Sequence, residues 1–187
     1  MKRRGRIAIM VGTGVIVSGL LIVSFVNFFY RSDAVTGSII TQEVRRLADI
    51  FHKIDKQCKI LGFDNQQNII NFLNVGTFTG SEVGPMNLGR PEKWEGPYVD
   101  DNPTIQSKEF MVVITDKGTF ITPGNGVRLA NGKVIGKDIV LSKDADIFAM
   151  AQDPELLQYK GRACAQKLNL TTKVPSSALE ELAHIEG

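Results

Sequence analysis

Two aspartates separated by one residue, Asp144 and Asp146, are the side chains whose type and spacing best suit metal binding. Calcium takes about six to eight oxygen ligands, usually from several carboxylates together with backbone carbonyls. The pair supplies only part of such a set, and Asp138 and Asp153 could reach the same ion only if the loop folds back. Calcium is the one cofactor that the sequence indicates, and a solvated loop is the alternative.

The two cysteines, Cys58 and Cys164, form a second candidate pair. In an oxidising compartment they could close a loop of about a hundred residues, which the chain-entropy model values at about 4.7 kcal/mol. Two buried free thiols are the alternative reading. A metal site built on these cysteines is not expected, because His52 and His184 are the only other soft ligands.

The sequence shows no pattern typical of catalysis. The stretches "TPGNG" and "ANGK" resemble phosphate-binding loops, but they lack the following helix and the Lys-Ser/Thr of a P-loop, so they indicate hairpin turns. Neither His52 nor His184 has a Ser or Cys nucleophile in a recognisable frame. We therefore do not expect an enzyme.

The only tryptophan lies in "PEKWEGPYVDD", where Trp94, Gly96, Pro97 and Tyr98 form a compact aromatic turn. Glycine followed by proline favours a turn that can fold both rings onto one seam, and two such rings can bury about 300–500 Å². We predict a packing lock between helix and sheet. An exposed ligand platform is the alternative.

The segment Ile7–Tyr30 contains no charged side chain and is long enough to cross a bilayer with some tilt, so it predicts a transmembrane helix. A cleaved secretory signal is the alternative, because residues 1–6 are basic. Those basic residues place the N-terminus in the cytoplasm and residues 31–187 outside it. Beyond the span, acidic groups slightly outnumber basic ones, so no nucleic-acid partner is expected.

Apolar residues at helical spacing predict an amphipathic helix over about 38–61 that continues the span and ends near Gly62. A short helix is expected at Asp64–Phe72. A glycine-rich loop follows over 73–108. The apolar stripe of the long helix consists of Ile40, Val44, Leu47, Phe51, Ile54, Cys58 and Leu61.

The residues that follow have the period of β-strands, with hairpins at Glu109–Thr122 and around Asn131-Gly132. They predict a small antiparallel sheet over about 109–142, whose open face the helix would cover. Short helices are expected in the tail, 148–187. The predicted fold is therefore α+β, with one long N-terminal helix on a small antiparallel sheet.

This order of elements resembles type IV pilin-like proteins, most closely the major pseudopilin of type II secretion systems. Trp94, Gly96, Pro97 and Tyr98 match the family's Trp-x-Gly-Pro-Tyr signature, and "DADI" at 144–147 is similar to its acidic calcium-binding tetrapeptide. Gly5 stands where the family's leader peptide ends. The resemblance thus implies a calcium site at Asp144 and Asp146, leader cleavage before Arg6 and methylation.

Two positions depart from the family pattern, because Arg6 and Met10 stand where its members usually have phenylalanine and glutamate. That glutamate is tolerated in a bilayer when it meets the free N-terminus of a neighbouring subunit. The resemblance implies a membrane-anchored structural component of a type II secretion or type IV pilus-like machine in a bacterial inner membrane. Its partners would be the bilayer, pilin-like subunits and other inner-membrane components. The alternative is an anchored periplasmic binding or scaffold protein that does not polymerise.

Overall fold

The computed structural model describes residues 18, 20, 21, 24 and 35–172 of the chain. The chain divides into two compact units, Met1–Val35 and Thr36–Gly187, and nearly all the described residues belong to the second. The expected leader boundary at Gly5 and Arg6 lies outside the described residues. So does almost all of the expected span at 7–30.

No helix in the described part of the chain is both long enough and apolar enough to cross a bilayer. This finding contradicts the predicted single pass through an inner membrane with a periplasmic C-terminal domain. It equally removes the basis for describing the chain as a membrane-bound pseudopilin of a secretion system. A span needs about 20 consecutive apolar residues, whereas the long described helix carries charged residues along its length.

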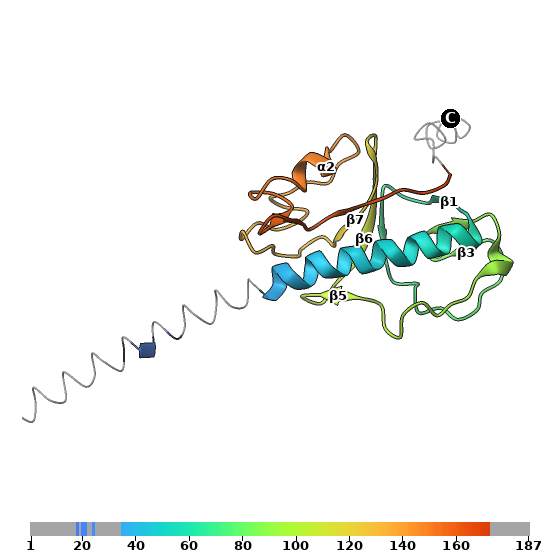
Figure 1. Cartoon of the computed structure of the whole chain (residues 1–187), viewed down its shortest axis with the longest axis horizontal. Helices are drawn as coiled ribbons and strands as arrows, with labels where there is room; N and C mark the ends of the chain where they lie inside the picture. The colour runs from blue at the N-terminus through green and yellow to red at the C-terminus, as the bar shows by residue number, and fades with distance from the viewer. Residues whose placement is uncertain (1–17, 19, 22–23, 25–34, 173–187) are drawn as a thin grey trace, which may run out of the picture. The chain divides into compact units, whose positions relative to one another are not determined.

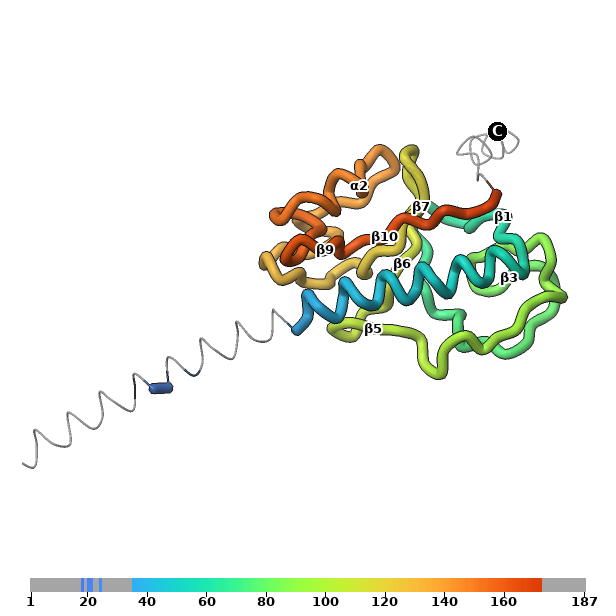
Figure 2. The backbone as a smooth tube through the Cα atoms, viewed as in Figure 1, coloured from blue at the N-terminus to red at the C-terminus, as the bar shows by residue number. Residues whose placement is uncertain are grey.

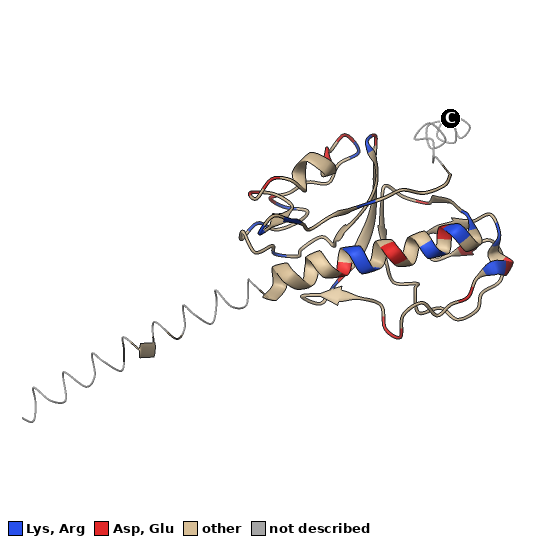
Figure 3. Cartoon of the chain, in the orientation of Figure 1, with Lys and Arg blue, Asp and Glu red and all other residues tan. Residues whose placement is uncertain are grey.

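That helix covers residues 35–58 (Figure 1). One of its faces is buried, and its exposed positions include charged residues. Apolar residues three and four positions apart share a face of a helix, and here they meet the sheets with almost no exposed surface. Figure 3 shows acidic and basic residues alternating along the helix. The fully buried members of the inner face are Ile40, Val44, Leu47, Phe51, Ile54 and Cys58.

The helix ends at residue 58 because the next residue, Lys59, takes a left-handed conformation with a φ of 58°. The buried side chain of Asp55 then accepts hydrogen bonds from the backbone N–H groups of Ile60, at 3.0 Å, and Thr171, at 2.7 Å. This carboxylate therefore fixes the helix end and ties it to the last described residues of the chain.

The strands are distributed over separate sheets. A three-stranded antiparallel sheet has the order β1-β4-β3, with β1 at Ile60–Phe63, β3 at Glu82–Val83 and β4 at Met86–Leu88. A short 3-10 helix, η1 at Pro91–Lys93, follows β4. β3, β4 and η1 lie within the segment 73–108 that was expected to be an irregular loop, and β1 begins where the predicted helix was expected to end.

The larger sheet is antiparallel with the order β10-β7-β6-β2, and β5 pairs with the start of β6. Its centre is the hairpin of β6 and β7, in which Thr115 pairs with Gly118 next to a two-residue turn. The strands are β2 (Gln67–Ile69), β5 (Thr104–Ile105), β6 (Lys108–Thr115), β7 (Gly118–Pro123) and β10 (Gln166–Leu168).

A third, two-stranded sheet joins β8 (Gln158–Tyr159) to β9 (Arg162–Ala163), and a short helix α2 (Ile147–Met150) precedes it. Figure 2 shows β10 running beside the long helix on its way to the end of the described chain. The β8–β9 hairpin also reaches the helix. A Cβ atom added to Gly37 would lie 2.5 Å from the Tyr159 ring, so only glycine permits this close contact.

The predicted fold, one long N-terminal helix on one small sheet with short C-terminal helices, is wrong. The described strands form three sheets, and between α2 and residue 172 the tail contributes β8, β9 and β10 instead of further helices. The rest of the predicted tail, 173–187, lies outside the described residues. The expected helix at Asp64–Phe72 is also absent, because β2 occupies that stretch and pairs with β6. The physical reason is tertiary, since strand pairing with distant segments outweighs local helical spacing.

Candidate functional site

The aromatic turn at 94–98 is packed against itself and against backbone. The rings of Trp94 and Tyr98 meet edge to face with centroids 4.8 Å apart, and Phe78 meets Trp94 in the same way at 5.4 Å. The indole N–H of Trp94 donates to the carbonyl oxygen of Val75 at 3.0 Å. The polar edge of the tryptophan is thus already engaged within the protein.

Tyr98 and Glu95 connect this turn to the last turns of the long helix. The Tyr98 hydroxyl donates to Oε1 of Gln57 at 3.4 Å, and Nε2 of Gln57 donates to Glu95 at 2.6 Å. The ammonium of Lys53 lies 5.4 Å from the centre of the Tyr98 ring and 3.7 Å from the Glu95 carboxylate. Burial, above all other causes, raises the pKa of the Tyr98 phenol, so the hydroxyl remains a hydrogen-bond donor at neutral pH.

Gly96 is required at its position for steric reasons. A Cβ atom placed there would lie 2.2 Å from the carbonyl oxygen of Val75 and 2.3 Å from the indole nitrogen of Trp94. Those two atoms are the partners of the Trp94 hydrogen bond, so a side chain at 96 would displace the bond itself. Together, the rings, their hydrogen bonds and this close approach make the segment 94–98 a lock between loop and helix.

Asp146 is a helix cap and an ion-pair partner. One carboxylate oxygen accepts the N–H of Ala149 at 3.0 Å at the start of α2, and the other accepts from the Lys117 ammonium at 2.5 Å. The hydrogen bond from Lys117 is the main reason that the pKa of Asp146 is lowered. A hydrogen bond with Ser142 lowers the pKa of Asp144.

In the described residues, Asp144 and Asp146 do not form a complete set of calcium ligands. Both oxygens of Asp146 accept hydrogen bonds. The Lys117 ammonium, and not a metal ion, balances the negative charge of Asp146. Asp138 and Asp153 are used locally, in bonds to the backbone N–H groups of Val134 and Glu155. Within the described residues, no three His, Cys, Asp or Glu side chains gather to hold a metal.

The candidate disulfide pair is present as two free, buried thiols, Cys58 and Cys164. Burial raises the pKa of Cys164 to about 12, and it is also the main cause of the raised pKa of Cys58. Cys58 lies beside the Tyr98 hydroxyl, whose proximity partly offsets the rise in the Cys58 pKa. Both thiols are therefore protonated packing groups at neutral pH, and neither has the character of a nucleophile.

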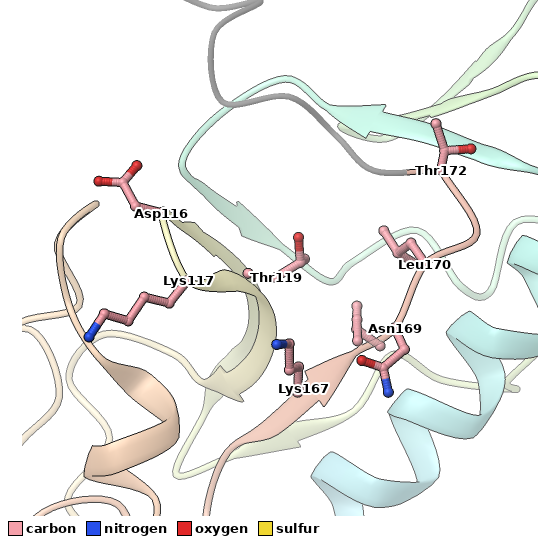
Figure 4. A pocket seen from close by; sticks show the side chains of 9 residues that line it. Asp116, Lys117, Thr119, Lys167, Asn169, Leu170 and Thr172 are labelled. Carbon is pink, nitrogen blue, oxygen red and sulfur yellow. The ribbon is translucent and has the colours of Figure 1, made fainter.

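An open cleft of about 470 Å³ lies beside the tip of the β6–β7 hairpin (Figure 4). Thr119 and Lys167 face it from neighbouring strands, and Asn169 and Thr172 from the chain that leaves β10. The Lys167 ammonium lies over the Phe120 ring, 6.0 Å from its centre. The lining offers hydroxyl, amide and ammonium groups together with the carboxylate of Asp116.

A second cleft, about 420 Å³, lies between the outer face of the long helix and the β8–β9 hairpin. We call it the arginine groove. Its basic residues are Arg45 and Arg46 from the helix and Arg162 from β9, and its other lining residues are Ser38, Thr41, Gln42 and Asp49. Arg162 comes from a tail that the sequence predicted to be helical, so sequence reasoning missed this site.

Comparisons with models of known protein families, with characterised proteins and with solved structures give no match. The pilin-like resemblance of the segment 94–98 therefore stays a prediction from the residues themselves.

Proposed function

We propose that this protein is a pilin-like structural component of a type IV pilus-like assembly, which works through contacts between subunits and not through catalysis. The proposal keeps the structural role that the resemblance implies. It leaves out the membrane span and the secretion system. Leader cleavage and methylation near Gly5 and Arg6 are not needed for it.

The observation that carries the proposal is how the Trp94–Tyr98 segment is used. Its polar groups bond to Val75, Gln57 and the adjoining backbone, and its rings pack on each other, so little is left to recognise a ligand. Because this segment holds a loop against the end of a helix, it supports a structural protein, one that acts by presenting a fixed surface to its neighbours. The charged outer face of the helix supports the same role, because it offers polar contacts to neighbouring subunits (Figure 3).

Sedimentation velocity of the full chain over a wide concentration range tests the proposal. A structural subunit is expected to sediment as a series of species whose average size grows with concentration. A single monomeric species at every concentration would contradict the proposal and would favour a binding or scaffold protein that does not polymerise.

A further inference from the structure

We infer that the arginine groove of one copy binds the acidic loop of a second copy, the loop being the exposed pair Asp100 and Asp101. This inference rests on the proposed function and names the surfaces through which copies would meet. It follows from two charged surfaces of the same domain, the basic groove and the acidic loop, which have opposite charge and include side chains without ion-pair partners among the described residues.

The groove carries more positive than negative charge. Among the described residues, the guanidinium groups of Arg45 and Arg162 have no ion-pair partner, whereas Arg46 is paired with Glu43 at 2.6 Å. Asp49 is the one acidic residue in the lining, so Arg45 and Arg162 leave a net positive site. Guanidinium groups from two elements are well suited to carboxylates, which they can bind through two parallel hydrogen bonds.

The groove also has a defined shape. The ring of Tyr159 packs on Gly37, so the β8–β9 hairpin is held against the helix and Arg162 is held opposite the helical arginines. Its volume of about 420 Å³ falls within the range of about 300–1,000 Å³ that is usual for ligand sites. Gln42, which is exposed in the lining, adds amide hydrogen-bond capacity beside the guanidinium groups.

The acidic loop is exposed but its two ends are fixed. On one side the N–H of Tyr98 donates to the carbonyl oxygen of Leu73 at 2.8 Å. On the other side the Asn102 amide donates to the carbonyl oxygen of Asn71 at 2.8 Å and to Asn74 at 2.9 Å. The carboxylates between these anchors have no ion-pair partner in the described part of the chain. Binding them would therefore order little additional backbone.

The two surfaces of one copy do not face each other. In Figure 2, β9, which holds Arg162, lies on one side of the long helix, and β5, which follows the acidic loop, lies on the other. The arginines of the groove therefore bind the acidic loop of another copy. Because the two contacting surfaces differ, the contact is heterologous, and repeating it gives an open chain of subunits unless the rotation closes a ring.

Charge reversal in the full-length protein tests this pairing. Variant one carries Arg45→Glu and Arg162→Glu, and variant two carries Asp100→Lys and Asp101→Lys. Each alone has like charges on both surfaces, so we expect self-association at least about tenfold weaker than in the unchanged chain. An equimolar mixture should associate again, because each groove then meets a loop of opposite charge. The control for variant one, Lys56→Glu with Lys137→Glu, changes the net charge by the same amount and sign on exposed residues outside the groove.

Sedimentation velocity of the four proteins and the mixture separates the outcomes, and circular dichroism melting checks that each variant is folded. Loss of association in both variants and its return in the mixture supports the pairing. If the unchanged chain associates and both variants associate equally well, the groove inference is overturned while the proposed function stands. If the unchanged chain stays monomeric, the proposed function fails and the inference fails with it.

Discussion

Replacing Gly96 with alanine should break the lock between the aromatic turn and the helix. The added Cβ would meet the carbonyl oxygen of Val75 at 2.2 Å and the indole nitrogen of Trp94 at 2.3 Å. Overpacking of this kind costs about 1–3 kcal/mol, and loss of the Trp94 hydrogen bond adds about 1 kcal/mol. We therefore expect the free energy of unfolding to fall by about 2–4 kcal/mol.

For a chain of this length, each 1 kcal/mol lowers the melting temperature by about 2–4 °C, so the expected decrease is about 5–15 °C. Trp94 is the only tryptophan, and its fluorescence reports directly on the lock during denaturation. Gly76→Ala is the matched control, because a Cβ atom there has only an ordinary contact, 3.8 Å from a Pro97 side-chain atom. If Gly96→Ala melts at the same temperature as Gly76→Ala, the steric reasoning is refuted.

Three further predictions concern other buried or paired groups. Asp55→Ala should lower the free energy of unfolding by about 3 kcal/mol, because two backbone N–H groups lose a charged acceptor; a loss no larger than that of the exposed control Asp49→Ala would contradict this. The pKa of Cys164, raised to about 12, means that a thiol reagent at pH 8 should label it only after unfolding, as measured by mass spectrometry; immediate labelling of the folded protein would be inconsistent with the burial. Calcium or a chelator should leave the melting temperature unchanged, because Asp146 is already paired with Lys117 and caps α2. A rise with calcium that disappears in the Asp144→Ala, Asp146→Ala variant would support the calcium prediction instead.

The pH dependence of Asp146 follows from its lowered pKa. A carboxylate whose pKa is depressed in the folded state contributes stability above its ordinary pKa, and this contribution is lost as the pH falls through the lowered value. Lys117→Met should remove the contribution, because the hydrogen bond from Lys117 is the main cause of the shift. Acid titration of the melting temperature, compared between the two proteins, measures it. Identical acid profiles would mean that the ion pair has no net effect.

The long helix could be predicted from sequence because its buried face is continuous, from Ile40 through Phe51 to Cys58. Its end could not be placed correctly. Gly62 was the expected cap, but Lys59 takes the left-handed conformation and Asp55 holds the following backbone. A distant bond from Thr171 takes part in this arrangement, and no local pattern records it.

The tail was misread for a similar reason. Leu157, Cys164 and Leu168 have helical spacing, but Lys160 and Gly161 both take positive φ values, 47° and 74°, and form the turn between β8 and β9. The arginine groove depends on that hairpin, so it could not be foreseen either. The tight turn itself could be predicted, because glycine followed by proline favours a turn. Its bonds to Val75 and Gln57 could not, because those partners lie 19 and 41 residues away from Trp94 and Tyr98 in the chain.

The central claim is that copies of this chain associate with one another. A photo-crosslinking residue in place of the exposed Gln42, at the rim of the arginine groove, tests it most directly in the full-length protein. We predict a ladder of crosslinked copies on a denaturing gel, with mass spectrometry placing the link in the peptide that contains Asp100 and Asp101. The same residue in place of the exposed Val140 should give no such link. If the Gln42 variant gives only uncrosslinked monomer on the gel, as the Val140 control does at the same concentration, the claim is contradicted.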